Sequence, residues 1–259
     1  MIITIESRSN DKIKSAQKLA SSSKYRKEKN EFFLEGLRLC YDACESGIEI
    51  SQLFFTENAR LKFGEKTEKM IEKAENAYLI REDIAEKLAE TRSSQGIFVV
   101  CKMGEKKDNK IDLTGKYVAL ENIQDPANLG AVIRTAEALG IKGAILSGCC
   151  DCFNPKALRA SMGSLLRLPL IFTDDLKKTL TDCMDNNMLV FATTPDSSAE
   201  KITDTDLNGG VVCVIGNEGN GVTKEILSLC RPVTIPMLGR AESLNASMAA
   251  AIVMWEMMR

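Results

Sequence analysis

The second half of the sequence alternates between short apolar runs and segments with helical spacing, and this pattern restricts the possible folds most strongly. The apolar runs are YVALENI, GAILS, LPLIF, MLVFATT, VVCVIG and VTIPM. The intervening segments with helical spacing are AVIRTAEALG, NPKALRASMGS and VTKEILSLC. Strands that alternate with helices form parallel sheets covered by helices on both faces. We therefore predict an α/β fold with a mostly parallel sheet for residues 117–259.

The first half of the sequence predicts a smaller α/β domain. A short strand and a helix follow each other in FFLEGLRLCYDACESG, ISQLFFT indicates a strand, EKTEKMIEKAENA indicates an exposed charged helix, and GIFVVCK indicates a buried strand. The polar stretch GEKKDNKIDLTGK then suits a linker. These features predict a domain over 1–105, a linker over 106–116 and a second domain over 117–259.

The chain of 259 residues contains no histidine. This excludes Ser-His-Asp and Cys-His catalytic arrangements and most catalytic zinc sites. Nine scattered cysteines, an odd number, indicate reduced thiols that mostly fill the core, as in a cytoplasmic protein. The C-x-x-C within CCDC has no second pair and no histidine partner, so we predict no metal site there. We also expect no secretory signal and no membrane span, because no apolar run approaches about eighteen residues.

The beginning of the chain is basic. Residues 1–30 carry eight Lys and Arg against three Asp and Glu, whereas the whole chain carries 34 against 36. Clustered basic side chains can replace the counterions of a phosphate backbone, so this segment is a candidate contact for a polyanion. A solvated amphipathic helix explains the same residues equally well, and both interpretations stay open.

Three loops after predicted strands are rich in Gly and Asn, and ligands of open α/β sheets bind where strands end. The first loop lies in ENIQDPANLGAVIRTAEALG. Asp125 and Pro126 end the strand there, and Asn128 lies at or near the start of a helix. Arg134 points about 140° away from the apolar stripe that starts at Leu129. A helix-capping Asn and a solvated Arg would explain both polar residues without any function.

The second loop lies in VVCVIGNEGNGVTKEIL, where an apolar strand leads into glycines and then a helix. Its glycine order differs from the dinucleotide motif, and it lacks the G-K-[ST] of a phosphate loop. Glu218 would repel a phosphate and suits a neutral or cationic ligand better. A tight turn with a Glu at the helix N-terminus remains the simpler alternative.

The third loop lies in VTIPMLGRAESLNASMAAAIVMWEMMR. Pro236 ends a strand, and Ser243 is well placed to cap the last helix. That helix is almost uncharged until Glu256, so it must be buried on the sheet or against a second copy of the chain.

In this order the three loops resemble the signature of the SpoU/TrmH family of RNA ribose 2'-O-methyltransferases, in the SPOUT superfamily. The segments that carry the resemblance are N-L-G-A-V-I-R-T-A, I-G-N-E-G-N-G-V and I-P-M-L-G-R-A-E-S-L-N-A-S-M-A-A-A. NPKALRASMGSLLRLP is also similar to the family, and FFLEGLRLCYDA and LAETRSSQGIFVV resemble its L30e-like substrate-binding domain. The resemblance therefore covers nearly the whole chain.

The resemblance implies transfer of a methyl group from S-adenosylmethionine to a ribose 2'-hydroxyl of structured RNA, without a metal. It further implies a deep trefoil knot in the C-terminal domain and a homodimer formed through that domain. The L30e-like domain and the basic start favour 23S ribosomal RNA over transfer RNA. Alternatives are the same reaction on transfer RNA and a non-catalytic dimeric RNA-binding protein. A dinucleotide-dependent oxidoreductase is disfavoured by the glycine order.

The resemblance also implies the residues of the site. The family's active-site positions are occupied here by Asn128, Arg134, Glu218, Ser243 and Asn245. The loops that hold the cofactor contain Thr193, Gly216, Asn217, Gly221, Ile235, Met237, Leu244 and again Asn245.

The family assigns Arg134 to the reacting ribose and phosphate and, in one proposal, to removal of the hydroxyl proton. Taking a proton from an arginine at neutral pH costs roughly 7 kcal/mol. We therefore favour an electrostatic role for Arg134, with Asn128 orienting the ribose. Glu218 is expected mainly to fix the glycine loop, and Ser243 and Asn245 to order the third loop.

Overall fold

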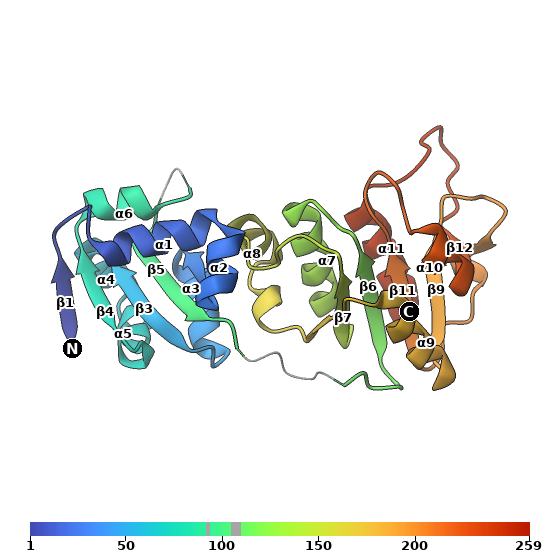
Figure 1. The fold of residues 1–259 in the computed structure, drawn as a ribbon, viewed down its shortest axis with the longest axis horizontal. Helices are drawn as coiled ribbons and strands as arrows, with labels where there is room; N and C mark the ends of the chain where they lie inside the picture. The colour runs from blue at the N-terminus through green and yellow to red at the C-terminus, as the bar shows by residue number, and fades with distance from the viewer. Residues whose placement is uncertain (92–93, 105–109) are drawn as a thin grey trace. The chain divides into compact units, whose positions relative to one another are not determined.

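The computed structural model describes residues 1–91, 94–104 and 110–259, which form two compact units (Figure 1). The first unit contains the described residues up to 104 and also Phe153–Leu166. The second contains 110–152 and 167–259. Residues 106–109 of the predicted linker lie outside the described residues, and the predicted domain boundaries stay a prediction.

The first unit is built on a five-stranded mixed sheet with the strand order β1-β4-β3-β5-β2, in which β5 runs antiparallel to both of its neighbours. Its strands are β1 (Ile2–Ile5), β2 (Glu31–Glu35), β3 (Ile50–Phe55), β4 (Ala77–Ile80) and β5 (Ile97–Lys102). Its helices include α1 (Asp11–Ser21), α2 (Ser23–Lys29), α3 (Leu37–Glu45), α4 (Glu57–Phe63), α5 (Glu65–Lys73) and α6 (Glu82–Leu88).

The core of the first unit follows from the spacing of apolar residues along its helices. Ile13, Ala16 and Leu19 recur every three residues on α1 and are buried, together with side chains of α6, against one face of the sheet. The sheet supplies aromatic residues such as Phe54 and Phe98 to this layer. α3 and α5 pack on strands of the same sheet and on each other, which covers the opposite face. The predicted smaller α/β domain is confirmed.

One segment departs from the predicted organisation. Phe153–Leu166 falls within the predicted second domain, yet it packs in the first unit. It contains α8 (Pro155–Ser161), which lies against β2, and the short 3-10 helix η1 (Ser164–Leu166). The ring of Phe153 lies 4.7 Å from that of Phe32, and Leu158 is buried. The helix itself was predicted, but its apolar spacing does not specify which sheet it covers.

The second unit contains a seven-stranded sheet with the order β10-β12-β9-β11-β6-β7-β8, in which every pair of neighbours is parallel. Its strands are β6 (Lys116–Glu121), β7 (Gly143–Ser147), β8 (Leu170–Phe172), β9 (Leu189–Thr193), β10 (Glu200–Lys201), β11 (Val211–Ile215) and β12 (Arg231–Thr234). All six predicted apolar runs contribute a strand.

Helices cover both faces of this sheet, as predicted (Figure 1). α9 (Leu176–Asp185) and α10 (Lys224–Leu229) pack on one face over the side chains of Val212 and Val214. α7 (Pro126–Leu139) and α11 (Ala246–Met258) pack on each other, on β7 and on β11. A 3-10 helix, η2 (Ile202–Asp204), also contacts α11. The trefoil knot stays a prediction.

The order of the strands shows where a ligand would bind. From β6 the chain adds β7 and β8 on one side, and it then crosses to build β9 and β11 on the other side. Such a switch point leaves a crevice outside the carboxyl ends of the central strands. Within the part of the chain that the structure describes, no helix has the length and apolar character needed to cross a membrane.

Candidate functional site

A cleft with a volume of about 320 Å³ opens at the carboxyl ends of β9, β11 and β12. This volume is at the small end of the range for small-molecule sites, about 300–1,000 Å³. The lining comes from the loops after these strands and from the start of α11. It consists of Thr193, Thr194, Pro195, Ile215, Gly216, Asn217, Glu218, Gly219, Asn220, Gly221, Thr234, Ile235, Met237, Glu242, Ser243, Leu244, Ala246 and Ala249.

Seven of the eight residues predicted to hold the cofactor line this cleft. They are Thr193, Gly216, Asn217, Gly221, Ile235, Met237 and Leu244. Asn245, the eighth, is outside the lining. Sequence reasoning missed Thr194, Pro195 and Glu242, which adjoin predicted positions and would have been found by taking each loop as a whole. Ala246 and Ala249, at the start of α11, have no sequence feature that would have indicated a place in the cleft.

In the glycine loop, residues 216–221, the two ends are joined by a pair of backbone hydrogen bonds. Asn217 N–H donates to the carbonyl of Gly221 at 3.0 Å, and Gly221 N–H donates back to Asn217 at 2.9 Å. A Cβ on Gly216 would lie 2.1 Å from the carbonyl carbon of Gly221 and 2.1 Å from the nitrogen of Val222. Position 216 therefore accepts only glycine without a shift of the backbone. This close packing explains a glycine-rich loop that matches neither nucleotide motif.

Glu218 fastens the glycine loop to the loop that precedes α7. Its Oε2 accepts a hydrogen bond from the N–H of Gln124 at 3.2 Å, and its Oε1 accepts from the N–H of Asp125 at 3.1 Å. Asn128 Nδ2 donates to the same Oε1 at 3.1 Å. Desolvation acts to raise the pKa of Glu218, but hydrogen bonds from Asn128 and from backbone N–H groups outweigh it and lower the pKa. The carboxylate is therefore ionised and poorly suited to accept a proton.

Asn128 and Asn245 extend this network to the third loop. Asn245 Nδ2 donates to Asn128 Oδ1 at 3.1 Å. Asn245 Oδ1 accepts from the N–H of Ser247 at 2.9 Å and from that of Met248 at 3.3 Å, which caps α11. A chain of hydrogen bonds thus runs from Glu218 through Asn128 to Asn245, and it joins all three predicted loops.

The predicted cap of the last helix was wrong, and the alternative that Asn128 caps its helix does not hold either. Asp125, not Asn128, caps α7, because its side chain accepts from the N–H of Ala127 at 2.9 Å and Pro126 follows as the first helical residue. Asn128 lies within the first turn of α7, so its predicted place near the helix start is confirmed. Asn245, not Ser243, caps α11, since the helix begins at Ala246. Ser243 is exposed and lines the cleft instead.

A second set of contacts anchors the glycine loop to the end of β6. Glu121 is buried, and its carboxylate accepts from the N–H of Thr223 at 2.8 Å and from its hydroxyl at 2.7 Å. Asn217 Nδ2 donates to the carbonyl of Asn122 at 2.8 Å. Sequence reasoning missed Glu121, although a carboxylate at the end of an apolar strand run was a signal. Both ends of the loop are therefore fixed to the strand that leads into α7.

Among the predicted active-site residues, Arg134 alone lies outside both the cleft and the hydrogen-bond network that joins the three loops. Its side chain is exposed on α7, it does not line the cleft, and it makes no hydrogen bond or ion pair with any residue that the structure describes. Ser243 likewise makes no hydrogen bond with a described residue. The guanidinium group and the Ser243 hydroxyl are thus available to groups from outside the chain.

The charge of the cleft restricts its ligand. The described residues that line it include two carboxylates, Glu218 and Glu242, and no Lys or Arg. Such a lining disfavours a ligand rich in phosphate and suits a cationic or neutral one.

The nearby thiols are not reactive at neutral pH, because burial raises the pKa of Cys150 and that of Cys152 to about 12. Among the residues described, no group of three or more potential metal ligands occurs.

Comparison with known proteins agrees with the geometry. The chain matches the model of the SpoU rRNA Methylase family over residues 115–255 and that of the MRM3-like substrate binding domain over 10–99. It is 30% identical to the 23S rRNA (guanosine(2553)-2'-O)-methyltransferase RlmP of Bacillus subtilis over 257 residues, 98% of each chain. It is 28% identical to an uncharacterised tRNA/rRNA methyltransferase of Synechocystis over 100% of this chain and 94% of the relative.

A solved structure is similar in fold along nearly the whole chain. The AdoMet-bound rRNA methyltransferase from Sinorhizobium meliloti superimposes with a TM-score of 0.86 at 27% identity, and the match covers 99% of this chain and 97% of the other. The family model spans more than half of the chain, and the Bacillus relative aligns along nearly all of it. The chain therefore belongs to the SpoU rRNA methylase family, and it is an RNA methyltransferase.

Proposed function

We propose that this enzyme transfers the methyl group of S-adenosylmethionine to a ribose 2'-hydroxyl of 23S ribosomal RNA. The observation that carries the proposal is the cleft whose wall contains Glu218, from which hydrogen bonds lead through Asn128 to Asn245. The name of the Bacillus relative and the ligand of the Sinorhizobium structure support it. Such a substrate places the enzyme in the cytoplasm, and all nine cysteines are free thiols, which suits a reducing compartment.

The cleft fits S-adenosylmethionine in size, polarity and charge. Ile235, Met237 and Leu244 offer apolar surface for an adenine ring, and the backbone of residues 216–221 offers amides and carbonyls. The cofactor carries a positive sulfonium group, which the two carboxylates of the lining do not repel. When bound, it supplies an electrophilic methyl group. The carboxylates would repel the phosphates of a dinucleotide, so the same observation disfavours the oxidoreductase alternative.

The side chains around the cleft are suited to position a ribose. Asn128 has its amide orientation fixed, because it donates to Glu218 and accepts from Asn245. Its second N–H and a remaining lone pair of its oxygen can meet a ribose hydroxyl. Ser243 offers an uncommitted hydroxyl on the cleft wall. Arg134, exposed and unpaired within the described chain, is suited to bind a phosphate of the RNA and to stabilise negative charge that develops on the 2'-oxygen.

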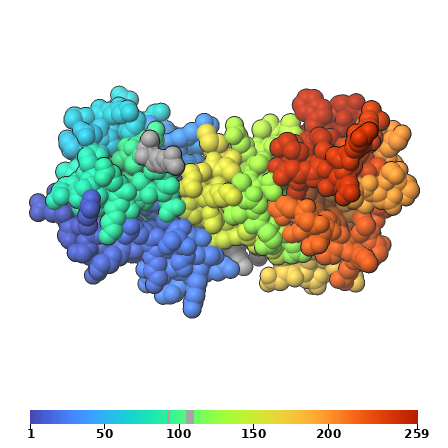
Figure 2. Space-filling view, turned by 90° about the horizontal axis from the view of Figure 1, so that it is seen from above, coloured from blue at the N-terminus to red at the C-terminus, as the bar shows by residue number. Residues whose placement is uncertain are grey.

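We also infer that the enzyme is a homodimer formed through its second unit. The last part of the chain, red in the space-filling view, lies at the surface of this unit (Figure 2). On α11 the side chains of Met248, Ile252 and Trp255 are 55%, 40% and 59% exposed. Their spacing of four and three residues puts them on one face of the helix. An apolar helix face open to water is typical of a surface that pairs with another chain.

The proposal is tested by methylation in vitro. The purified full chain is incubated with labelled S-adenosylmethionine and either unmodified 23S ribosomal RNA or unmodified transfer RNA, and ribose methyl groups are mapped. We expect one 2'-O-methylated nucleotide in 23S ribosomal RNA. Labelling of transfer RNA alone would identify transfer RNA as the substrate. Absence of label in both, together with no calorimetric binding of S-adenosylmethionine, would leave the non-catalytic RNA-binding protein as the correct interpretation.

A further inference from the structure

We propose that α1 and α2 together form the surface of the first unit that binds the phosphate backbone of the substrate RNA. We refer to these helices, Asp11–Ser21 and Ser23–Lys29, as the basic helix pair. The inference rests on the proposed function only in that the RNA is the one to be methylated. Both helices lie within residues 10–99, the part of the chain that matches a substrate binding domain.

The basic helix pair differs in charge from the other helices of its unit. α1 and α2 together carry seven Lys and Arg against two acidic residues. α4 and α5, a second pair of consecutive helices, carry five against four. Arg26 is buried and donates to the carbonyls of Leu19 and Ala20, so it does not contribute to the surface. The other six basic residues are exposed lysines.

Most of these lysines lack a neutralising partner. Lys14 pairs with Asp11 at 3.2 Å. The other five make no ion pair with any described residue; they are Lys12, Lys18, Lys24, Lys27 and Lys29. Five unpaired ammonium groups on two adjoining helices produce a positive potential that attracts a polyanion.

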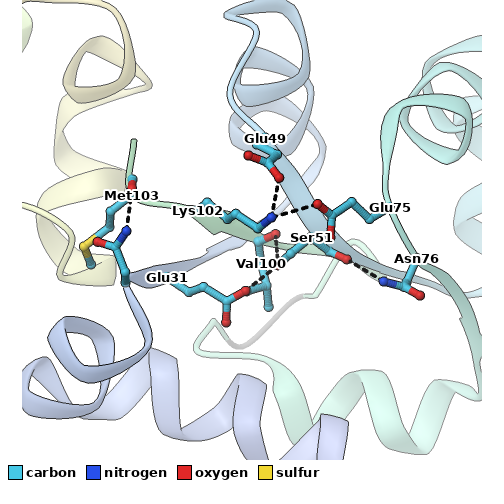
Figure 3. Close-up of polar contacts among 9 residues, drawn as sticks. Glu31, Glu49, Ser51, Glu75, Asn76, Val100, Lys102 and Met103 are labelled. Carbon is cyan, nitrogen blue, oxygen red and sulfur yellow. Dashed lines mark hydrogen bonds and ion pairs between the residues drawn. The ribbon is translucent and has the colours of Figure 1, made fainter. Parts of the chain in front are cut away.

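Several basic residues elsewhere in the first unit are paired with carboxylates. Lys102 contacts Glu49 and donates to Glu75 at 2.8 Å, at the end of β5 (Figure 3). Lys69 pairs with Glu45 at 2.7 Å. Their charges are offset locally, so these positions attract a distant anion much less than the basic helix pair does.

Aromatic rings position the ammonium groups without neutralising them. Nζ of Lys18 lies 4.3 Å from the ring centre of Tyr25, and Nζ of Lys29 lies 5.7 Å from the same ring. Nζ of Lys12 lies 5.2 Å from the ring centre of Tyr78. A ring attracts a cation through its quadrupole and leaves the charge intact. These side chains therefore lose less conformational entropy when a phosphate binds.

Tyr25 also connects the two helices of the pair. It belongs to α2, and its hydroxyl lies 3.1 Å from Ser15 Oγ on α1. One ring thereby brings together Lys18 of α1 and Lys29 of α2. α1 and α2 lie side by side in the fold, and they contact each other (Figure 1). Positive charge from two segments of the chain is concentrated on one surface, as contact with successive phosphates requires.

The test compares two matched triple variants of the full chain. The first removes the ring-held lysines of the basic helix pair, K12Q/K18Q/K29Q. The control, K62Q/K66Q/K69Q, removes three lysines of α4 and α5 that also lie over rings, at 5.4, 5.2 and 5.7 Å. Both variants lose three charges and three cation–π contacts. Unmodified 23S ribosomal RNA is the probe, and its dissociation constant is measured between 50 and 200 mM KCl.

We expect the slope of log affinity against log salt to flatten by about 2 to 3 in the first triple, since each lost phosphate contact changes it by roughly 0.7 to 0.9. The control should change it by less than about 1. A K12R/K18R/K29R variant should restore the slope, which distinguishes lost charge from a folding defect. Equal changes in both triples, or an unchanged slope in the first, would overturn the proposal, and the latter result would point to an acidic protein as the partner. Failure of the proposed function would instead appear as absence of methyl transfer in the wild-type enzyme, whatever the salt slopes.

Discussion

At the scale of single residues, Glu218 has the largest number of contacts that link the loops of the cleft. Its carboxylate accepts from two backbone N–H groups and from Asn128, all of them in or next to the first turn of α7. A glutamine at this position would keep the shape and replace one acceptor oxygen by an NH₂ group that faces donors. The energetic consequence of this change depends on whether the native side chain is ionised.

We predict that Glu218→Gln lowers the free energy of unfolding by about 1 to 2 kcal/mol at neutral pH, since several hydrogen bonds to a partly exposed charge are lost. The lowered pKa of Glu218 fixes the sign of the pH dependence. Its contribution is present above the ordinary value for Glu, about 4.3, and is lost as pH falls through the lower value in the folded state. Melting temperatures of wild type and variant should therefore converge below about pH 4.

Glu242→Gln is the matched control for this experiment. Glu242 also lines the cleft, but it makes no hydrogen bond with a described residue. Its replacement should leave the melting temperature nearly unchanged at every pH. A gap between wild type and Glu218→Gln that stays constant from pH 7 to pH 3.5 would show that the charge of Glu218 is not what stabilises the loop.

Arg134 is a second side chain whose role a single substitution can test. A guanidinium group binds a phosphate through two parallel hydrogen bonds, which an ammonium group cannot do. Arg134→Lys should therefore lower kcat/KM for RNA by about tenfold or more and leave the affinity for S-adenosylmethionine unchanged. Arg259→Lys, at an arginine that pairs with Glu256, is the control. If Arg134→Lys kept most of the turnover across neutral pH, neither a specific arginine base nor a bidentate contact could be maintained.

At the scale of elements, the glycine loop between β11 and α10 offers two glycines with opposite surroundings. A Cβ on Gly216 would lie 2.1 Å from backbone atoms, whereas one on Gly219 would meet only Asn217 Oδ1, at 3.6 Å. Gly216→Ala should cost about 2 to 3 kcal/mol in urea unfolding and weaken binding of S-adenosylmethionine, because the loop must open. Gly219→Ala should stay within about 0.5 kcal/mol of the wild type. Equal effects of the two would mean that the loop is not closely packed.

The elements themselves could largely be predicted from the sequence. The apolar runs of the second unit gave its strands, because a strand buried on both faces needs a continuous apolar run. The ends of the helices were less predictable. Several residues near each start are chemically able to cap, and only the backbone path decides between Asp125 and Asn128, or between Ser243 and Asn245.

The candidate site was predictable where residue type and position coincide. Glycines, asparagines and apolar residues at strand ends identified most of the cofactor positions, since the loops after parallel strands gather at one edge. The supporting contact of Glu121 with Thr223 joins residues about a hundred positions apart. Spacing along the chain contains no information on such a pairing, so it required the structure.

At the scale of the whole molecule, the assignment of Phe153–Leu166 to the first unit shows a further limit of sequence patterns. The apolar face of α8 is evident in the sequence, but an apolar face is satisfied by any complementary surface. Here the complement is the β2 side of the first sheet, with Phe32 against Phe153. The chain passes from the first unit to the second within the polar residues at 104–116, and Phe153–Leu166 is the segment that this simple division leaves out.

Helix α11 is apolar nearly all round, and this composition bears on how the molecule assembles. Its inner face, with Ala250, Val253 and Met257, is buried in the second unit. The outer face with Ile252 and Trp255 is exposed in the single chain. Helices that are apolar on all sides are buried on all sides. In a symmetric homodimer, a second copy of the chain covers such a face.

Light scattering should therefore give twice the chain mass of 28.5 kDa. Trp255→Glu should give the monomer, because burying a charge opposite its own symmetry mate is unfavourable. Leu61→Glu is the control, since Leu61 is 75% exposed on the first unit and should leave the mass unchanged. A wild-type monomer, or a Trp255→Glu protein that keeps the double mass, would exclude α11 as the interface. In the expected case the apolar composition of α11 is explained by assembly, and the exposed face of the single chain is the site where its partner binds.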